Sequence, residues 1–375
     1  MIYLDYNATT PVLPEVWAAM QPYFTTRWGN PSSSYRFGAH LKNDIEAARE
    51  SVARLIGADG TEIIFTSCAT ESNNAAMNAA LLARPAKRHI VTSAVEHSAV
   101  LNYCKAAEKR GYQVTYLGVD DEGRLNLSEL ETAITNDTAL VSLMWANNET
   151  GVLFPVAEIS VICQRKGVLF HCDAVQAVGK IPVDVRQVEA DYLTISAHKI
   201  YGPKGIGGLY VRKGSPFEPL LVGGHQEDGR RGGTENVGLI VGFGLAAGAA
   251  ERELELRREQ ASARRDQLEV ELLKQIPGAT INGARELRIP NTTNLWFPGI
   301  DSVALVAYLD SQNVCVSSGS ACLAQSIMPS HVILAMTDSF NRARQSVRFS
   351  LSHLITFDNI QDASKCVRKG IELMR

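Results

Sequence analysis

The chain has 375 residues, 45% hydrophobic and 21% charged, which is enough for a soluble protein with a large core and a second, smaller domain. Its formal net charge of −3 argues against binding to nucleic acid or an anionic membrane, and its sequence holds no apolar run of membrane-spanning length. Seven cysteines without metal-binding spacings, and no basic amino-terminal segment, lead us to expect reduced thiols, a cytoplasmic location and no structural metal.

The first part of the chain begins with an extended polar stretch within residues 1–40, interrupted by a short helix over 15–23. Apolar residues then recur at helical spacing over 40–56. A strand over 62–66 runs through small polar residues into an alanine-rich helix over 74–83. The start of that helix offers free N–H groups to a phosphate, although an ordinary serine or threonine cap explains the same residues.

Strands and helices continue to alternate up to residue 211. We expect strands at 89–93, 113–117, 139–144, 168–172, 192–195 and 207–211, the last a candidate antiparallel strand, and helices at 98–110, 127–134 and 156–166. This rhythm predicts an α/β domain with a mostly parallel sheet, which we expect to have seven strands.

The remaining chain has a different character. A glycine-rich loop over 223–236 precedes a helix over 238–275, and an α+β lobe follows, with strands at 294–297 and 346–350, helices at 302–312 and at the carboxyl end, and a loop at 315–326. We expect a large domain over 15–255 and a small domain made of 1–14 and 256–375.

Polar side chains follow the carboxyl ends of five predicted strands. A capping or turn role would explain each of them alone, but parallel strands bring their carboxyl ends to one edge of the sheet, where ligands bind. The sequence therefore predicts a binding site formed by Thr70, His97, Asn148, Asp173, Gln176, His198 and Lys199.

Lys199 follows the apolar strand over 192–195. Burial at a strand end would lower the pKa of its amine, and the neutral amine is the form that attacks a carbonyl to make a Schiff base. Taken alone, an exposed lysine in a turn fits the segment equally well.

A Schiff-base lysine suggests pyridoxal phosphate as the cofactor. Asp173 suits its pyridinium nitrogen, His97 its ring face, and Arg348 the carboxylate of an amino-acid substrate. Donors for the phosphate and the phenolic oxygen are Ala69, Thr70, Asn148, Gln176, Ser196 and His198.

From end to end the chain resembles the cysteine desulfurases of the nitrogen-fixation and iron–sulfur-cluster type, in the class V aminotransferase superfamily of fold-type I pyridoxal-phosphate enzymes. The resemblance is carried by YLDYNATTPV, GNPSSSYRFG, IIFTSCATESNN, VEHSAV, NNETG, HCDAVQAVGK, SAHKIYGPKG, GGTENV, SSGSAC and RFSL. SAHKIYGPKG together with SSGSAC is highly specific.

The resemblance implies roles for the matching residues. Lys199 would hold the cofactor and move the Cα proton, and His97 would stack on the ring and assist proton transfer. Cys322, in SSGSAC, would take the sulfur of L-cysteine as a persulfide, releasing L-alanine, and pass it to an acceptor, which we expect to be an iron–sulfur scaffold protein. Arg348 would hold the substrate carboxylate with help from Asn147 or Asn148, and Thr234 would reach the phosphate of a neighbouring subunit in a homodimer. Cys322 could also contact a transferred iron–sulfur cluster.

The cysteines differ in their surroundings. Cys322 lies among serine and glycine residues, which suits a thiol that must reach both a deep cofactor and an outside partner. Cys104, Cys163, Cys172, Cys315 and Cys366 are expected to be structural. The chain departs from the family at Cys68, where many relatives have glycine, and at Tyr35, where histidine is common. We favour a role for Cys68 as a small packed residue over a role as a second nucleophile.

Three other functions remain compatible with the sequence. Selenocysteine lyase, or another lyase or aminotransferase of the same superfamily, would use the same lysine without needing Cys322. A non-catalytic assembly protein that kept the fold is disfavoured by the presence of Lys199, Asp173 and Cys322. The sequence does not decide between a nitrogen-fixation and a housekeeping role.

Overall fold

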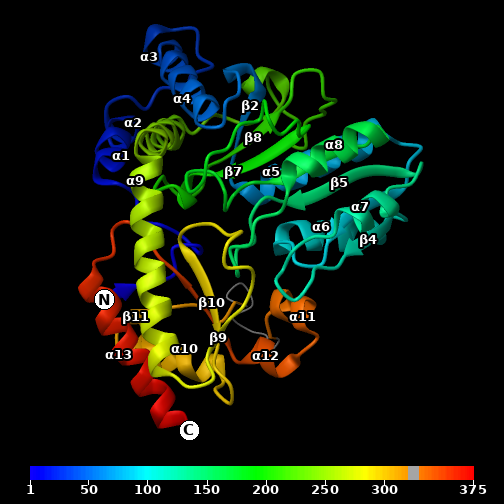
Figure 1. The fold of residues 1–375 in the computed structure, drawn as a ribbon. Helices are drawn as coiled ribbons and strands as arrows, with labels where there is room; N and C mark the ends of the chain where they lie inside the picture. Colours follow the sequence, from blue (N-terminus) through cyan, green and yellow to red (C-terminus); the bar gives the residue numbers. More distant parts are fainter. Residues whose placement is uncertain (320–328) are drawn as a thin grey trace.

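The computed structural model describes residues 1–319 and 329–375 (Figure 1). Within them, seven strands form one sheet in the order β2-β8-β7-β6-β5-β3-β4. The strands are β2 (Ile63–Thr66), β3 (His89–Ser93), β4 (Gln113–Leu117), β5 (Thr138–Met144), β6 (Leu169–Asp173), β7 (Tyr192–Ser196) and β8 (Gly207–Val211). In this sheet β8 runs opposite to the other six strands, which are parallel to one another, so the predicted mostly parallel α/β sheet is confirmed.

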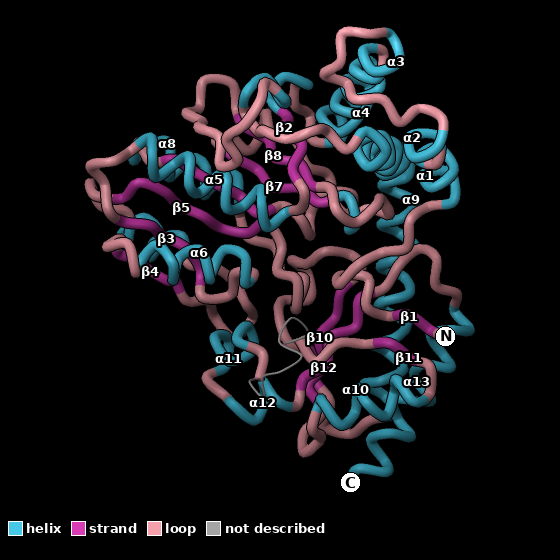
Figure 2. Tube along the Cα trace, turned by 180° about the vertical axis from the view of Figure 1, so that it is seen from behind, coloured by secondary structure: helices cyan, strands magenta, loops and turns pink. Residues whose placement is uncertain are grey.

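Helices cover the sheet and make its central strands fully buried. They are α4 (Leu41–Leu55), α5 (Ala69–Ala83), α6 (Ser98–Glu108), α7 (Leu127–Ala133) and α8 (Val156–Lys166), seen from the other side in Figure 2. The many alanines of α5 let it pack closely on the sheet, with Ala75, Ala76 and Ala80 buried. Continuous apolar strands are typical of a parallel sheet covered on both faces.

The carboxyl-terminal part contains two smaller sheets. One pairs β12 (Ser346–Ser350), β10 (Thr292–Trp296) and β9 (Thr280–Ile281), and the other pairs β1 (Ile2–Tyr3) with β11 (Val314–Cys315). With α10 (Ser302–Ser311) and α13 (Phe357–Met374), they enclose a hydrophobic cluster that includes Leu4, Phe297 and Phe349.

A single long helix, α9 (Val237–Gln275), runs beside both parts of the molecule (Figure 1). Its first half contributes Phe243 and Ala250 to the cluster around the large sheet, and its second half contributes Leu268 to the carboxyl-terminal cluster. The domain boundary expected between residues 255 and 256 therefore falls inside one helix, and the division into two domains stays a prediction.

Several element bounds differ from the sequence prediction. The alanine-rich helix α5 begins at Ala69 and not at residue 74, so Ala69 and Thr70 belong to its first turn. The helix expected over 15–23 is two helices, α1 (Pro14–Met20) and α2 (Pro22–Thr25), because Pro22 has no N–H to continue the first.

Short elements went unpredicted because they are too short to show a period. They are α3 (Arg36–Ala39), α11 (His331–Thr337), α12 (Phe340–Arg344), the strands β1, β9 and β11, and the 3-10 helices η1 (Gly60–Glu62), η2 (Ala197–Lys199) and η3 (Gln226–Gly229). None of the helices in the described ranges combines the length and apolar character needed to cross a membrane.

Candidate active site

A cavity of about 250 Å³ lies where the strands β3, β5, β6 and β7 end. Eight of the residues predicted from the sequence line it: Ala69, Thr70, His97, Asn148, Asp173, Gln176, His198 and Lys199. The parallel strands bring these side chains together, as the carboxyl edge of such a sheet does for ligand sites generally.

Lys199 is held at the wall of the cavity by the amino-terminal segment. Its Nζ donates to the backbone carbonyls of Asn7 and Ala8, the latter at 2.8 Å. The turn after it places Tyr201 at φ +70°, and Thr10 stabilises this turn by accepting from the Tyr201 N–H at 2.9 Å. Residues 7–10 therefore fix the position of the lysine although they lie about 190 residues away in the sequence.

Asp173 is the last residue of β6 and is nearly buried at the cavity wall. Its Oδ2 accepts from Asn73 Nδ2 at 2.8 Å, and its Oδ1 accepts from the N–H of Val175 at 3.1 Å. Two neutral donors orient the carboxylate without neutralising its charge. The group is therefore suited to hold a protonated ring nitrogen.

The first turn of α5 supplies a site for an anion. Ala69 and Thr70 both line the cavity, and the cap residue Cys68 makes no side-chain hydrogen bond to the first turn, so the N–H groups there are open to a phosphate. At the end of β7, the hydroxyl of Ser196 is buried and has no hydrogen-bond partner among the described residues. Burying a hydroxyl without a hydrogen-bond partner costs free energy, so Ser196 is suited to bind a ligand that is not part of the polypeptide.

Burial favours the neutral form of both histidines of the site. Burial, assisted by the charge of Lys199, lowers the pKa of His198 to about 4. Burial also lowers the pKa of His97, whose Nδ1 accepts from the N–H of Ala99 at 3.2 Å. The proton of His97 is accordingly assigned to Nε2, and both rings can donate a hydrogen bond without carrying a charge.

Asn148 lies in the loop after β5, and the structure shows how this loop is formed. The Oδ1 of Asn147 accepts from the N–H groups of Glu149 at 2.9 Å and Thr150 at 3.0 Å, which closes a tight turn. Asn148 is thereby turned to the cavity, and its Oδ1 is buried without a partner among the described residues.

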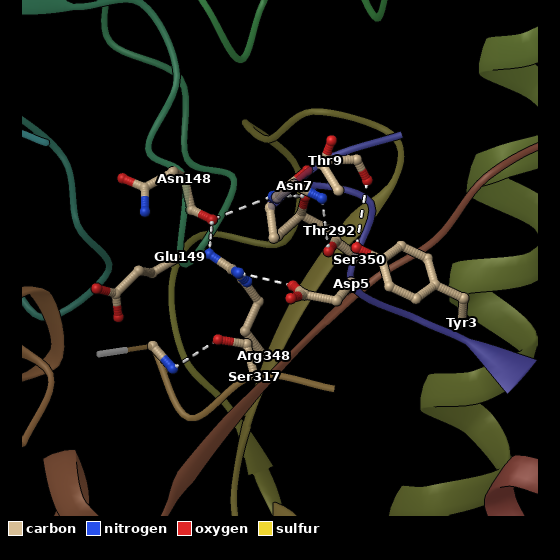
Figure 3. Close-up of polar contacts among 12 residues, drawn as sticks. Tyr3, Asp5, Asn7, Thr9, Asn148, Glu149, Thr292, Ser317, Arg348 and Ser350 are labelled. Carbon is tan, nitrogen blue, oxygen red and sulfur yellow. Dashed lines mark hydrogen bonds and ion pairs between the residues drawn. The ribbon is translucent and has the colours of Figure 1, made fainter. Parts of the chain in front are cut away.

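Arg348 is buried on β12 and is not among the residues that line the cavity. Its Nη2 pairs with Asp5 Oδ1 at 2.7 Å and its Nη1 donates to the carbonyl of Asn148 at 3.0 Å (Figure 3). Its Nε is buried without a partner among the described residues. Sequence reasoning missed Asp5, which would share this guanidinium with any substrate carboxylate.

Ser196 and Thr234 are also not among the residues that line the cavity. Thr234 is exposed and lines a separate cavity of about 220 Å³, together with Gly205 and Arg231. Cys322 lies outside the described residues. Two described residues, one before and one after Cys322 in the sequence, lie close to the same oxygen of Glu149. Ser330 Oγ donates to Glu149 Oε2. Gly319, at φ +84°, lies so near that a Cβ on it would be 2.4 Å from that oxygen.

Three of the six described cysteines are buried, and the half-buried Cys68 lines the cavity. Cys104, Cys163 and Cys172 are buried, and burial raises the pKa of the first two to about 12. Within the described ranges, no group of three His, Cys, Asp or Glu residues could hold a metal ion.

Sequence reasoning also missed Asn7, Ala8 and Asn73, which complete the site. Asn73 lies three residues after Thr70 on one helix face, so the later start assigned to α5 concealed it. Asn7 and Ala8 lie in a segment without periodicity, where only the motif YLDYNATTPV marked them.

Known proteins resemble the whole chain. The aminotransferase class-V family matches residues 2–362. A cysteine desulfurase from Trichormus azollae is 51% identical over 375 residues, which are 100% of this chain and 94% of that protein. A solved NifS-like protein has a TM-score of 0.93 at 37% identity, covering 99% of both chains. A structure of SspA in complex with cysteine has a TM-score of 0.82 at 36% identity, covering 94% of this chain and 99% of that one. The chain therefore belongs to the class-V aminotransferases and, among them, to the cysteine desulfurase family.

Proposed function

We propose that the cavity binds pyridoxal 5'-phosphate and that the protein uses it to convert L-cysteine into L-alanine, passing the sulfur to Cys322. The observation that carries this proposal is that Lys199, Asp173 and the first turn of α5 line one cavity. These are the amine, the carboxylate and the anion site that the cofactor's aldehyde, ring nitrogen and phosphate require.

The residues present fit the cofactor on structural grounds. The buried hydroxyl of Ser196 has no partner among the described residues, and the carboxylate of Asp173 accepts from two neutral donors. Ala69, Thr70, Ser196 and His198 would hold the phosphate, Asn148 and Gln176 the phenolic oxygen, and His97 the ring face. When bound, the cofactor would supply an electron sink for the charge that develops at the substrate Cα.

The chain's own groups would carry out the remaining tasks. Lys199 Nζ would take the Cα proton and return it, and the neutral His97 could hold a proton beside it. Cys322, as a thiolate, would attack the substrate sulfur, so that an S–S bond forms while the Cβ–S bond breaks. Cβ keeps the electron pair and is then protonated, which yields L-alanine and a persulfide on Cys322. Arg348 would hold the substrate carboxylate in competition with Asp5.

The partners and the setting belong to the same proposal. The persulfide would pass to a sulfur acceptor, for which we propose an iron–sulfur scaffold protein. The protein would act in the cytoplasm as a homodimer, with Thr234 reaching the neighbouring subunit's phosphate. The exposure of Thr234, away from the cavity of its own chain, supports this arrangement.

The test uses the purified protein with pyridoxal phosphate and L-cysteine. We expect an absorbance band from the lysine-bound cofactor, alanine formation and a persulfide on Cys322. Cys322→Ala should abolish both products, whereas Cys366→Ala, on the surface helix α13, should leave them unchanged. A protein that binds no pyridoxal phosphate, or a Cys322→Ala variant that makes alanine from cysteine at full rate, would refute the proposal.

The Cys322→Ala variant also distinguishes a cysteine desulfurase from a selenocysteine lyase, because selenocysteine can be cleaved without that thiol. If Cys322→Ala and the unmodified protein both cleave selenocysteine and neither cleaves cysteine, the protein is a selenocysteine lyase. Persulfide transfer to an iron–sulfur scaffold, measured against transfer to a tRNA-thiolation protein, tests the proposed acceptor.

A further inference from the structure

A second lysine lies buried beside the proposed cofactor site. Lys180 ends the turn that follows β6, and its Nζ donates to Asn7 Oδ1 at 2.8 Å and to Gln176 Oε1. Gly179, at φ +73°, makes this turn possible, because a Cβ there would lie 2.5 Å from Ile200, next to Lys199. Lys180 has no role in the chemistry proposed above.

The contact with Lys180 determines which way the amide of Gln176 faces. Lys180 Nζ donates to Gln176 Oε1, so the oxygen of the amide is turned to Lys180. The Nε2 of Gln176 then donates one N–H to the carbonyl of Asn7 at 3.1 Å. Since Gln176 lines the cavity, its second N–H is left to donate there.

The same amine orients Asn7. Asn7 Oδ1 accepts from both Lys180 and Asn291, so its Nδ2 is the donor to the carbonyl of Asn148 at 3.1 Å and to Thr292 at 2.8 Å (Figure 3). The carbonyl of Asn7 in turn accepts from Lys199 and from Gln176. Asn7 thus connects the two lysines, and an amide turned the other way would place N–H against N–H.

We propose that Lys180 is a positioning residue for the cofactor: through Gln176 it makes the cavity present an N–H donor to the phenolic oxygen of pyridoxal phosphate. This inference rests on the proposed function. A carbonyl oxygen in the same place would face that oxygen with a second acceptor and repel it. Lys180 therefore acts on the cofactor without touching it.

The charge state of Lys180 agrees with this geometry. Burial lowers its pKa well below the usual value, and the charges of Lys199 and Arg348 act in the same direction. No carboxylate among the described residues pairs with it. In either charge state the amine has N–H groups for both acceptors, Asn7 Oδ1 and Gln176 Oε1.

The experiment compares the affinity of the cofactor-free protein for pyridoxal phosphate in four variants by spectroscopic titration. We expect Lys180→Met to bind about tenfold more weakly, the effect of losing roughly one oriented hydrogen bond. In a Gln176→Ala background, Lys180→Met should cause no further loss, because the residue it positions is gone. Lys369→Met, at an exposed site on α13, is the matched control and should bind like the unmodified protein.

A merely structural role would show itself in the stability of the cofactor-free protein. We expect Lys180→Met to lower the melting temperature by no more than about 4 °C, because Asn7 Oδ1 keeps Asn291 as a donor and only Gln176 Oε1 loses one. Gln176→Glu provides an independent measurement: it keeps an oxygen for Lys180 but has no N–H to donate, and should also bind about tenfold more weakly.

Three outcomes would overturn the inference. The first is that Lys180→Met binds pyridoxal phosphate as tightly as the unmodified protein. The second is that Lys180→Met weakens binding by the same factor in the Gln176→Ala background as in the unmodified protein. The third is that Gln176→Glu binds pyridoxal phosphate with unchanged affinity. The last outcome applies even if Lys180→Met does not fold. Failure of the unmodified protein to bind pyridoxal phosphate would instead refute the proposed function as well.

Discussion

Glu227 is buried in the loop that carries Thr234, and we expect Glu227→Gln to destabilise the folded chain strongly. Its carboxylate makes a two-point pair with Arg49 of α4, with N···O distances of 2.6 and 3.0 Å. It also accepts from the N–H of Phe65 on β2 at 2.8 Å, and the Arg49 guanidinium lies over the Phe65 ring. This one side chain therefore joins the loop to a helix and to the edge of the large sheet.

The size of the effect follows from the burial of the pair, whose side chains are only 8% and 3% exposed. Burial disfavours the Arg49 cation, but the hydrogen bonds and charge of Glu227 outweigh it and raise the arginine pKa. Without Glu227, Arg49 keeps the carbonyl of Ile63, at 3.0 Å, and a single carboxylate, Glu46, whose side chain is 62% exposed. Removing one partner of a buried pair costs about 3 to 5 kcal/mol. With an unfolding entropy of about 2.1 cal/mol/K per residue, this lowers the melting temperature of a chain of 375 residues by about 4 to 6 °C.

The assay is thermal and urea unfolding of the cofactor-free protein. Asp228→Asn is the matched control, because Asp228 is the next residue in the same loop but its side chain is 93% exposed, 3.9 Å from Arg230. We expect it to change the unfolding free energy by less than about 0.5 kcal/mol. If the two substitutions have equally small effects, the buried pair does not hold the loop and the reasoning is wrong.

Three further predictions concern the site. Lys199→Ala should lose the absorbance band of the bound cofactor and slow alanine formation by at least about 100-fold, the usual contribution of a general base; retention of the band would contradict the assignment of the lysine. Asp173→Asn, which keeps the size of the side chain and one acceptor oxygen but not its charge, should weaken cofactor binding and turnover, and unchanged values in both would exclude a role in charge pairing. Burial, with a smaller effect from Asp173, raises the pKa of Glu96 from 4.5 to about 8. Between these pH values the folded state keeps a proton that the unfolded state loses. The free energy of unfolding therefore falls as the pH rises. Glu96→Gln should remove this fall in urea unfolding between pH 5 and 8, and an equally steep fall in the variant would show that another group causes it.

The family, the class of the sheet and the assembly of most of the cavity could be predicted from the sequence. Apolar runs such as 192–195 indicate strands, because a strand that is covered on both faces of the sheet is apolar along its whole length. Polar residues just after such runs must meet, since parallel strands all end at one edge of the sheet. For this reason Asp173 and Lys199 could be placed together before any coordinates were known.

Only the tertiary structure decided what surrounds those residues. Asn7 meets Lys199 and Lys180 across more than 170 residues of sequence, and Arg348 meets Asp5 across 343. No periodicity reports such contacts, because they depend on how the amino-terminal segment and β12 fold back onto the sheet. The sequence by itself determined which chemical groups the site contains, through local pattern and the geometry of a parallel sheet. The tertiary structure decided how their hydrogen bonds are directed and which of them are already paired, since buried polar groups must find partners wherever the fold places them.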